Sequence, residues 1–222
     1  MDQTNQGTIN YRDEVVRKLI HLCSLSIPIV YYFVSQKTGI AVLAILALAA
    51  LIIDLARFYS DRAGGIFYSI FGFLLREHEV DTGKKNLNGA TYVLLSALLC
   101  ILIFPKVIFL TAFTVLIVSD SIAALFGRKF GKHKFLFKSL EGTLAFFISG
   151  IIVVLFTPKI DYLFGEYIIG VIGVAVGAIA ENVSFGLADD NLAIPLSIGV
   201  TMWLLYFFMM PNLQLILNNV PR

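Results

Sequence analysis

The segment Asp120–Gly142 reads DSIAALFGRKFGKHKFLFKSLEG, and it separates two long apolar runs of the chain. It begins with a carboxylate near the end of one run, continues through a basic loop spaced by glycines, and closes with Lys-Ser-Leu-Glu-Gly at the start of the next run. Only 14% of all residues are charged. Because charge near lipid is expensive and usually functional, the segment predicts a membrane-boundary site that binds a polyanion together with a metal ion.

The composition around this segment is that of an integral membrane protein. Hydrophobic residues make up 58% of the 222 residues, compared with about 45–50% in ordinary soluble domains. Apolar runs follow one another from Leu19 to Met210 without a polar interval long enough for a second domain. Residues 1–222 are therefore expected to form a single transmembrane domain, and its first apolar run is expected to be a retained span rather than a signal peptide.

The lengths of the runs predict the fold class. A spanning helix needs about 20 apolar residues, within a range of roughly 17–25. We expect an all-α polytopic membrane protein with about seven transmembrane helices and a cytoplasmic N-terminus. The predicted spans are 19–36, 39–58, 88–104, 107–126, 140–157, 165–185 and 192–210. The apolar stretch within 64–75 is too short to span comfortably and is expected to be a helix in the interface.

Lysine and arginine predict the orientation, because these residues gather in cytoplasmic loops. With the N-terminus inside, the opposite face keeps few of the 17 basic residues, namely Lys37, Lys106, Lys159 and Arg222. The same topology brings Asp120–Gly142 to the cytosol. The short polar N-terminus favours a bacterial plasma membrane as the location. We expect no nucleic-acid partner, and the residues predict no oligomeric state.

Two common types of nucleotide site are excluded because their motifs are absent from the sequence. The chain has neither a Gly-x-x-x-x-Gly-Lys-Ser/Thr loop nor a Gly-x-Gly-x-x-Gly turn after a strand, so it has no soluble-type kinase or dinucleotide site. Gly170, Gly173 and Gly177 in the sixth span are expected to let helices pack closely. Cys23 and Cys100 lie inside apolar runs and show neither a disulfide framework nor metal-ligand spacing.

Asp120 is the first candidate for chemistry. On a helix it shares a face with Ala124 and Gly127, at i, i+4 and i+7, which leaves space beside the acid. At 1.5 Å per residue it lies roughly 10 Å below the loop. A carboxylate there must be protonated or paired with a metal or a basic side chain. The structural alternative is an acid satisfied by Ser119, Ser121 or a neighbouring lysine.

The loop that follows combines glycines, cations and a helix cap. The predicted nucleotide-binding residues are Gly127, Arg128, Gly131, Lys132, Lys138 and Ser139. The two glycines permit positive φ and close backbone approach, and the three basic side chains supply the cations that a triphosphate requires. Ser139 stands at an N-cap position, and the N–H groups of the helix it opens form an anion site. The alternative is that the loop merely obeys the positive-inside rule.

The pattern Asp-x-x-Ala-x-x-x-Gly-Arg-x-x-Gly-Lys, followed after five residues by Lys-Ser-x-Glu-Gly, resembles the signature of the CTP-dependent lipid kinases. This family includes dolichol kinase, phytol and farnesol kinase, and CTP-dependent diacylglycerol kinase. The match covers 23 positions, and a related signature occurs in CDP-diacylglycerol synthase. The resemblance implies CTP as phosphoryl donor, Mg²⁺ as cofactor and a membrane lipid alcohol as acceptor: a polyprenol such as dolichol, phytol, farnesol or diacylglycerol.

Two flanking motifs favour the kinases over the synthase. Glu14–His21, with Arg17-Lys18 in its middle, resembles the opening motif of the kinases, and Glu181 with Asp189-Asp190-Asn191 resembles their C-terminal acidic motif. The synthase would show basic residues at that C-terminal position. This chain has none between Lys159 and Arg222.

These resemblances imply a role for each polar residue. The implied catalytic residues are Asp120, Glu141, Glu181 and Lys138. The implied metal ligands are Asp120, Glu181, Asp189 and Asp190. The implied lipid-binding residues are Arg17, Lys18 and His21. Most of them also have a purely structural alternative. Arg17 and Lys18 could anchor the end of a helix, and His21 could be a polar residue whose hydrogen bonds are satisfied within the protein. Asp189 and Asp190 could place favourable negative charge at the N-terminus of a helix.

Three functions follow from this pattern. The first is transfer of the γ-phosphoryl group of CTP to a lipid hydroxyl. The second is a CDP-lipid synthase, in which a lipid phosphate attacks the α-phosphorus, and the third is a transporter or flippase whose intramembrane acids relay protons. The preference for CTP rests on the resemblance alone. Backbone groups of Gly127–Gly131, or the side chains of Asn182 and Ser184, are candidates for reading the cytosine.

Overall fold

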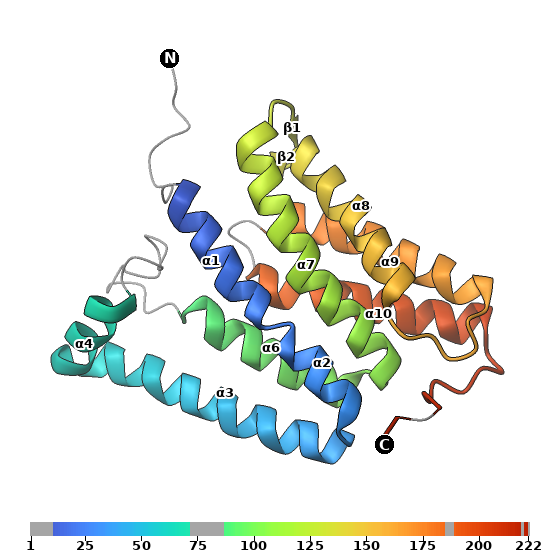
Figure 1. Cartoon of the computed structure of the whole chain (residues 1–222), viewed down its shortest axis with the longest axis horizontal. Coiled ribbons are helices and arrows are strands. Elements are labelled where there is room, and N and C mark those ends of the chain that lie inside the picture. The colour runs from blue at the N-terminus through green and yellow to red at the C-terminus, as the bar shows by residue number, and fades with distance from the viewer. Residues whose placement is uncertain (1–10, 72–86, 185–188, 219, 222) are drawn as a thin grey trace.

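A computed structural model describes residues 11–71, 87–184, 189–218 and 220–221 of the chain. These residues form an all-α membrane protein with one short hairpin (Figure 1). The elements are, in chain order, α1 Tyr11–Cys23, α2 Ser26–Phe33, α3 Gln36–Tyr59, α4 Asp61–Phe71, α6 Gly89–Ile103, α7 Lys106–Phe130, β1 Lys134–Phe135, β2 Lys138–Ser139, α8 Leu140–Phe156, α9 Phe164–Val183 and α10 Asp190–Met209.

The helices agree with the predicted class. Within the described residues, five helical segments are long and apolar enough to cross a membrane, and they are α1 with α2, α3, α7, α9 and α10. The helices α6 and α8 are also apolar but shorter, at 15 and 17 residues, so the count of seven spans stays a prediction. The helix α4 overlaps the predicted interfacial stretch 64–75, of which residues 72–75 lie outside the described residues.

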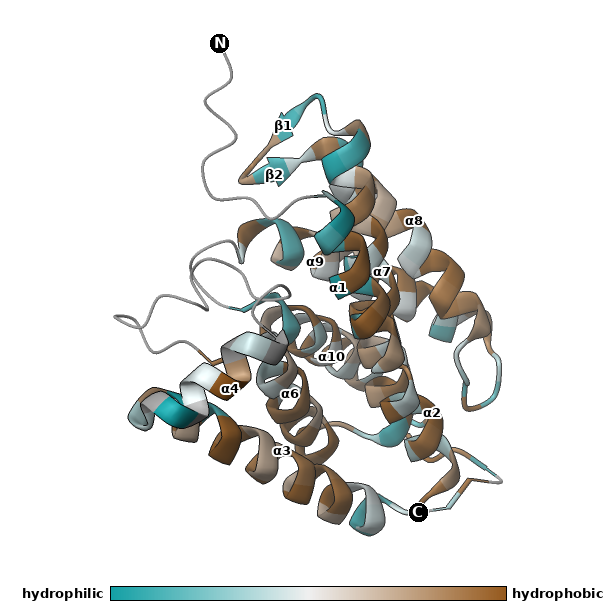
Figure 2. Cartoon of the chain, turned by 60° about the vertical axis from the view of Figure 1, so that its left-hand side comes forward, coloured by the Kyte–Doolittle hydropathy of each residue, from teal (hydrophilic) through white to brown (hydrophobic). Residues whose placement is uncertain are grey.

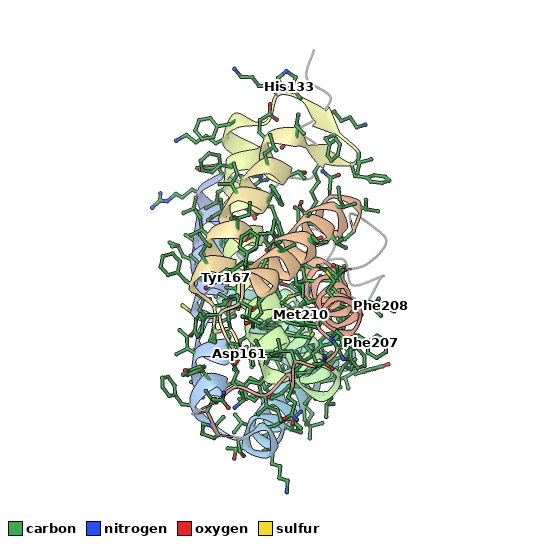
Figure 3. All side chains as sticks on the ribbon, turned by 90° about the vertical axis from the view of Figure 1, so that its right-hand side faces the viewer. His133, Asp161, Tyr167, Phe207, Phe208 and Met210 are labelled. Carbon is green, nitrogen blue, oxygen red and sulfur yellow. The ribbon has the colours of Figure 1, made fainter. Side chains whose placement is uncertain are left out.

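The helix α7 lies at the centre of the bundle. It packs against α1, α2, α6, α8, α9 and α10, and most of its apolar side chains are buried. Hydrophobic ribbon dominates the surrounding helices, whereas hydrophilic residues gather at helix ends and at the hairpin (Figure 2). On α10, Phe207 and Phe208 are exposed and project outwards (Figure 3). Apolar side chains on both the core side and the outer side of a helix are expected where the surroundings are lipid.

The first span begins earlier than predicted. The predicted range was 19–36, whereas the structure starts α1 at Tyr11. Glu14 and Lys18 lie within this helix and are buried. Hydropathy assigns such residues to water, and it therefore places the start of the span too late when they face a polar interior.

Local sequence signals set other helix ends. Pro28 has no N–H to donate to the carbonyl of Ser24, which explains the break between α1 and α2. Three N-caps each accept a hydrogen bond from the N–H three positions later, and they are Ser35, Asn88 and Ser139. The predicted N-cap at Ser139 is therefore confirmed.

The glycines of α9 lie where neighbouring helices come close. A Cβ atom on Gly170 would lie 2.6 Å from Val154 of α8, and one on Gly177 would lie 2.6 Å from Ile198 of α10. A Cβ atom on Gly173 would lie 2.9 Å from a side-chain carbon of α10. The prediction of close helix packing is confirmed.

The two short strands define one end of the molecule. β1 and β2 pair antiparallel between α7 and α8, with Phe135 opposite Lys138. We call this the hairpin end: α1, α6, α8 and α10 begin toward it, and α3, α7 and α9 end toward it. The helices α3 and α7 diverge in that direction (Figures 1 and 2).

A buried polar cluster occupies the α8–α9 turn, away from the hairpin. Lys159 is 3% exposed, and its Nζ donates to two backbone carbonyls and to the Thr157 hydroxyl. Glu166 is fully buried and accepts from three backbone N–H groups of the turn. Burial lowers the pKa of Lys159 to about 8, although Glu166 acts to raise it. Asp161 of this turn lies far from His133 of the hairpin (Figure 3).

Candidate active site

Three carboxylates from three helices meet near the hairpin end. Asp120 lies in α7, Glu181 in the last turn of α9, and Asp190 in the first turn of α10. One oxygen from each lies within 4.8 Å of the others. Asp120 and Glu181 are each only 4% exposed. Like charges this close require cations to stay ionised, so the cluster is a candidate cation site. The sequence predicted all three as metal ligands.

Two lysines supply positive charge to the cluster. Lys18 Nζ lies 2.6 Å from Asp120 Oδ2, and Lys138 Nζ lies 2.6 Å from Glu181 Oε1 and 3.2 Å from Asp190 Oδ2. Burial acts to lower the pKa of Lys138, but the Asp190 and Glu181 carboxylates raise it above its ordinary value. The Lys138 ammonium therefore stays charged.

The opening motif of the chain reaches the same cluster. Lys18 and Asp120 are 102 positions apart, and α1 brings them together by packing on α7. His21 Nε2 lies 3.7 Å from the same Asp120 oxygen. The sequence predicted lipid binding for Arg17, Lys18 and His21. In the structure, Lys18 forms its ion pair with Asp120, the acid of the central motif.

A second ion-pair group joins α1 to the end of α7. Glu14 is 5% exposed, and it pairs with Arg17 of its own helix and with Arg128, whose Nη1 lies 3.5 Å away. Arg128 was predicted to bind nucleotide. Sequence reasoning gave Glu14 no role, although its place three residues before Arg17 was a signal that the two side chains meet.

The predicted glycine loop is mostly helix. Gly127 lies inside α7, and Gly131 ends that helix with a φ of −62°, so neither glycine uses the positive φ that its lack of a side chain permits. The predicted close approach is correct: a Cβ atom on Gly127 would lie 3.0 Å from Ser139 Oγ and 3.4 Å from Gly142 Cα. Lys132 follows the helix and is exposed. Glycine is needed here because the ends of α7 and α8 nearly touch.

Glu141 lies in the first turn of α8, where it contacts His133 before β1, and not in the carboxylate cluster. Its Oε1 is 2.7 Å from His133 Nδ1, and both of its oxygens accept from the His133 backbone N–H. This placement favours a role in shaping the hairpin over the predicted catalytic role. His133 was missed by sequence reasoning, since its spacing from Glu141 follows no regular repeat.

Asn182 anchors the hairpin to α9. Its Oδ1 accepts from the backbone N–H groups of Phe137 and Lys138, at 2.9 and 3.2 Å, and its Nδ2 donates to Thr143 Oγ1. The side chain is fully buried. Its amide was a candidate for reading cytosine, but both ends of it are already engaged. Ser184 is also engaged, donating to the Glu181 carbonyl and lying against Asp190.

The two neighbouring aspartates of α10 have different positions. Asp189 is the N-cap, and its Oδ1 accepts from the backbone N–H and the side chain of Asn191. Asp190 joins the carboxylate cluster. Asp189 therefore takes the alternative helix-terminal position and lies outside the cluster, whereas the metal-ligand role of Asp190 stays a prediction.

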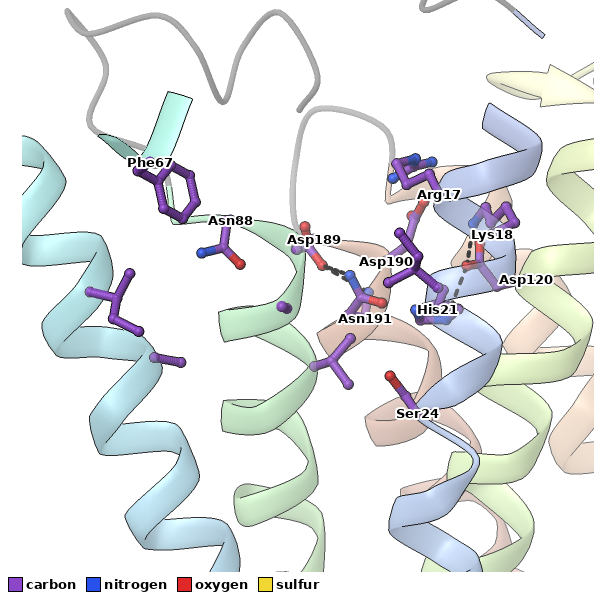
Figure 4. A pocket seen from close by; sticks show the side chains of 16 residues that line it. Arg17, Lys18, His21, Ser24, Phe67, Asn88, Asp120, Asp189, Asp190 and Asn191 are labelled. Carbon is purple, nitrogen blue, oxygen red and sulfur yellow. Dashed lines mark hydrogen bonds and ion pairs between the residues drawn. The ribbon is translucent and has the colours of Figure 1, made fainter. Parts of the chain in front are cut away.

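A cavity of about 400 Å³ adjoins the cluster (Figure 4). Its polar side includes Arg17, Lys18, His21, Asp120 and Asp190. Its other side is apolar and is formed by residues of α3, α4 and α6. A cavity with convergent charged groups on one wall and apolar groups on the other fits a small amphipathic ligand.

Comparison with known proteins identifies the family. The chain is 30% identical over 169 residues to CTP-dependent diacylglycerol kinase 1 of Schizosaccharomyces pombe, with 70% of this chain and 74% of that protein covered. The chain belongs to the family of the CTP-dependent diacylglycerol kinases. The kinase of the same name from Saccharomyces cerevisiae is 26% identical over 214 residues, with 85% of this chain and 72% of that protein covered.

A bacterial protein is similar over more of its length. An uncharacterised protein of Rickettsia prowazekii is 30% identical over 193 residues, which cover 86% of this chain and 93% of that protein. No family model and no solved structure matches the chain. The kinase family is nevertheless the one that the central motif resembles, so the resemblance is confirmed at the level of the family.

Proposed function

We propose that this protein transfers the γ-phosphoryl group of CTP to the hydroxyl of a membrane lipid alcohol, with diacylglycerol as the acceptor. The single observation that carries the proposal is the meeting of Asp120, Glu181 and Asp190 within 4.8 Å, beside a cavity with one polar and one apolar side. A lipid alcohol has a polar hydroxyl end and apolar chains, so it needs the polar side and the apolar side of the cavity together. The names of the yeast relatives support the donor and the acceptor.

The basic residues around this site fall into two groups, one expected to bind the phosphates and one that lines the cavity. Phosphoryl transfer depends mostly on positioning and on neutralising the charge of the phosphates. Lys138 is held at the cluster by two carboxylates, and Arg128 and Lys132 lie on the α7 side of the hairpin. These three would hold the phosphates. Lys18 and Arg17 line the cavity, where they meet the transferred group and the acceptor.

The carboxylate cluster fits a divalent cation. Asp120, Glu181 and Asp190 present oxygen ligands, the donor type that Mg²⁺ takes in nucleotide sites, and they would hold it against the phosphates. When bound, the ion would neutralise charge on the transferred phosphoryl group. Lys18 and Lys138 form ion pairs with these acids and offset their negative charge. The cluster is therefore compatible with the folded protein both without the ion and with the ion bound.

The hairpin end would face the cytosol, where CTP is found. The basic residues of the hairpin region support this orientation, and the described basic residues predicted for the opposite face, Lys37, Lys106 and Lys159, lie at the start of α3, the start of α7 and the α8–α9 turn. The bacterial relative supports a plasma membrane as the host. Nucleotide would then arrive from water and the alcohol from the bilayer.

The test is a labelled-phosphate assay. Purified protein in mixed micelles is incubated with Mg²⁺, γ-labelled CTP and, in turn, diacylglycerol, a polyprenol, phytol and farnesol. We expect label on diacylglycerol and release of CDP. CDP-lipid and pyrophosphate as products would support the synthase, and absence of any nucleotide turnover would support the transporter.

A further inference from the structure

The cavity beside the carboxylates reaches the outer surface of the helix bundle. Ile20 of α1 and Ile53 of α3 both line it, yet their exposed fractions are 51% and 52%. A side chain that lines a cavity and is half exposed marks the rim of an opening. The two isoleucines lie on different helices, so the opening lies between α1 and α3.

The two sides of the opening belong to helices that have different packing partners. The helix α1 packs on α7, whereas α3 packs on α6 and α4. Asp54 of α3 accepts hydrogen bonds from the backbone and side-chain N–H groups of Asn88, at 3.0 and 2.8 Å, which ties α3 to α6. Toward the hairpin end α3 diverges from α7 (Figure 1), and the cavity is lined by residues of α1 and α7 on one side and of α3, α4 and α6 on the other.

The opening lies within the apolar part of α3, a helix that is long and apolar enough to cross a membrane. Ile53 is six residues from the end of α3, which corresponds to about 9 Å along the helix. Behind the rim, Ala50, Phe67 and Val93 continue an apolar wall into the cavity. The charged wall with Asp120 faces them across the cavity (Figure 4).

We propose that this opening, which we name the α1–α3 portal and define by Ile20 and Ile53, admits the acyl chains of a glycerolipid alcohol from the bilayer. The inference rests on the proposed kinase function. The cavity of about 400 Å³ is near the lower end of ligand pockets, which hold about 300–1,000 Å³. It therefore accommodates the glycerol group and the first part of the chains. The remaining chain length stays in lipid and passes through the portal.

Adjacent residues provide matched controls. Ile52 is 56% exposed and Leu19 is 57% exposed, so they resemble Ile53 and Ile20 in exposure, but neither lines the cavity. We expect Ile53→Trp and Ile20→Trp to raise KM for a long-chain diacylglycerol about tenfold or more, because a bulky side chain blocks passage of the chains. The variants Ile52→Trp and Leu19→Trp should leave KM unchanged.

Two further readouts separate blocked entry from general damage. Dihexanoylglycerol, whose short chains fit largely inside the cavity, should lose much less turnover in Ile53→Trp than the long-chain lipid does. The dissociation constant for CTP, measured by titration calorimetry, should be the same in Ile53→Trp and Ile52→Trp. Equal KM values for the long-chain lipid in these two variants, with wild-type turnover in both, would overturn the portal and leave the kinase function standing.

Photolabelling tests the portal without any turnover. A diacylglycerol with a diazirine in its acyl chain is activated on the wild-type protein in nucleotide-free micelles, and the labelled peptides are identified by mass spectrometry. We expect adducts around Ile53 and Ile20 that excess unlabelled diacylglycerol suppresses. Adducts spread evenly over other exposed faces, such as Ile148 and Ile152 of α8, would refute the portal. Suppressible portal labelling in a protein that phosphorylates no lipid would instead refute the proposed function.

Discussion

Asp120 of α7 is the residue at which charged groups from three other helices meet. Lys18 and His21 approach it from α1, and Glu181 and Asp190 lie beside it. We predict that Asp120→Asn lowers kcat about 100-fold or more, because it removes the charge that organises cations around the phosphates while keeping the side-chain shape. Turnover of labelled CTP on diacylglycerol is the measurement. Near-normal turnover would make Asp120 a structural residue only.

The pairing with Lys18 supplies a control for folding. Breaking a buried ion pair on one side costs about 3–5 kcal/mol, because it leaves an uncompensated charge, so Asp120→Asn alone lowers stability as well. The double variant Asp120→Asn with Lys18→Met restores neutrality. We expect it to recover thermal stability in detergent but not activity.

Lys138 tests whether the basic residues act individually. It contacts both Glu181 and Asp190, whereas Lys129 is exposed and contacts the ring of Phe130. We predict that Lys138→Met lowers kcat/KM for CTP about 100-fold, and that Lys129→Met changes it little. Comparable losses in the two variants would show that the region acts as a diffuse positive patch.

At the scale of elements, the hairpin depends on one amide. Asn182→Leu would keep the approximate volume but remove the acceptor of two partly buried backbone N–H groups, at a cost of about 0.5–1.5 kcal/mol each. We predict a lower unfolding temperature together with reduced kcat, since the backbone of Lys138 loses its anchor.

Thr143→Val is the matched control for this amide. It removes the hydroxyl that accepts from Asn182 Nδ2 and donates to the Ser139 carbonyl, and it leaves the contacts of Asn182 to the backbone of Phe137 and Lys138 in place. We expect a small loss of stability and nearly normal kcat. A wild-type kcat in Asn182→Leu would separate the hairpin from catalysis.

The α8–α9 turn predicts a pH dependence of stability. Burial lowers the pKa of Lys159 to about 8 in the folded protein, whereas the unfolded value is about 10.4. The charged form therefore destabilises the fold below pH 8, and this cost disappears as the pH rises from about 8 to 10.4.

The difference between wild type and Lys159→Met isolates this effect from other titrating groups. Thermal unfolding in detergent is compared at pH 7, 8.5 and 10. The wild type should gain stability relative to the variant across this series. A constant difference would contradict the lowered pKa.

The elements were largely predictable from sequence, and their side-chain partners were not. Apolar runs predicted the helices because lipid imposes length and composition on each span independently. The start of α1 was missed because Glu14 and Lys18 face a polar interior, which becomes visible only once α7 is placed beside them. Glu141 was given chemistry by its motif, but a motif does not say which way a side chain points.

At the scale of the whole molecule, distant motifs meet because the spans run in alternating directions. Residues at the start of α1, the end of α7, the end of α9 and the start of α10 are far apart in the sequence but lie at the same end of the bundle. Topology therefore predicted that Asp120, Glu181 and Asp190 would share a face. The pairing of Lys18 with Asp120 required the packing of α1 on α7, which no local pattern encodes.

The last prediction concerns the two soluble components of the reaction. With Asn182 engaged by the hairpin, base recognition falls to other groups, among them the last carbonyls of α7, which lack intrahelical partners. An unsatisfied polar group in a closed pocket costs about 1–3 kcal/mol, or roughly 5–150-fold in binding. We predict that kcat/KM for CTP exceeds that for ATP by about this factor. EDTA should abolish turnover and added Mg²⁺ should restore it, since three clustered carboxylates otherwise face the phosphates. Equal rates with ATP would refute base selection, and activity in EDTA would refute the metal site.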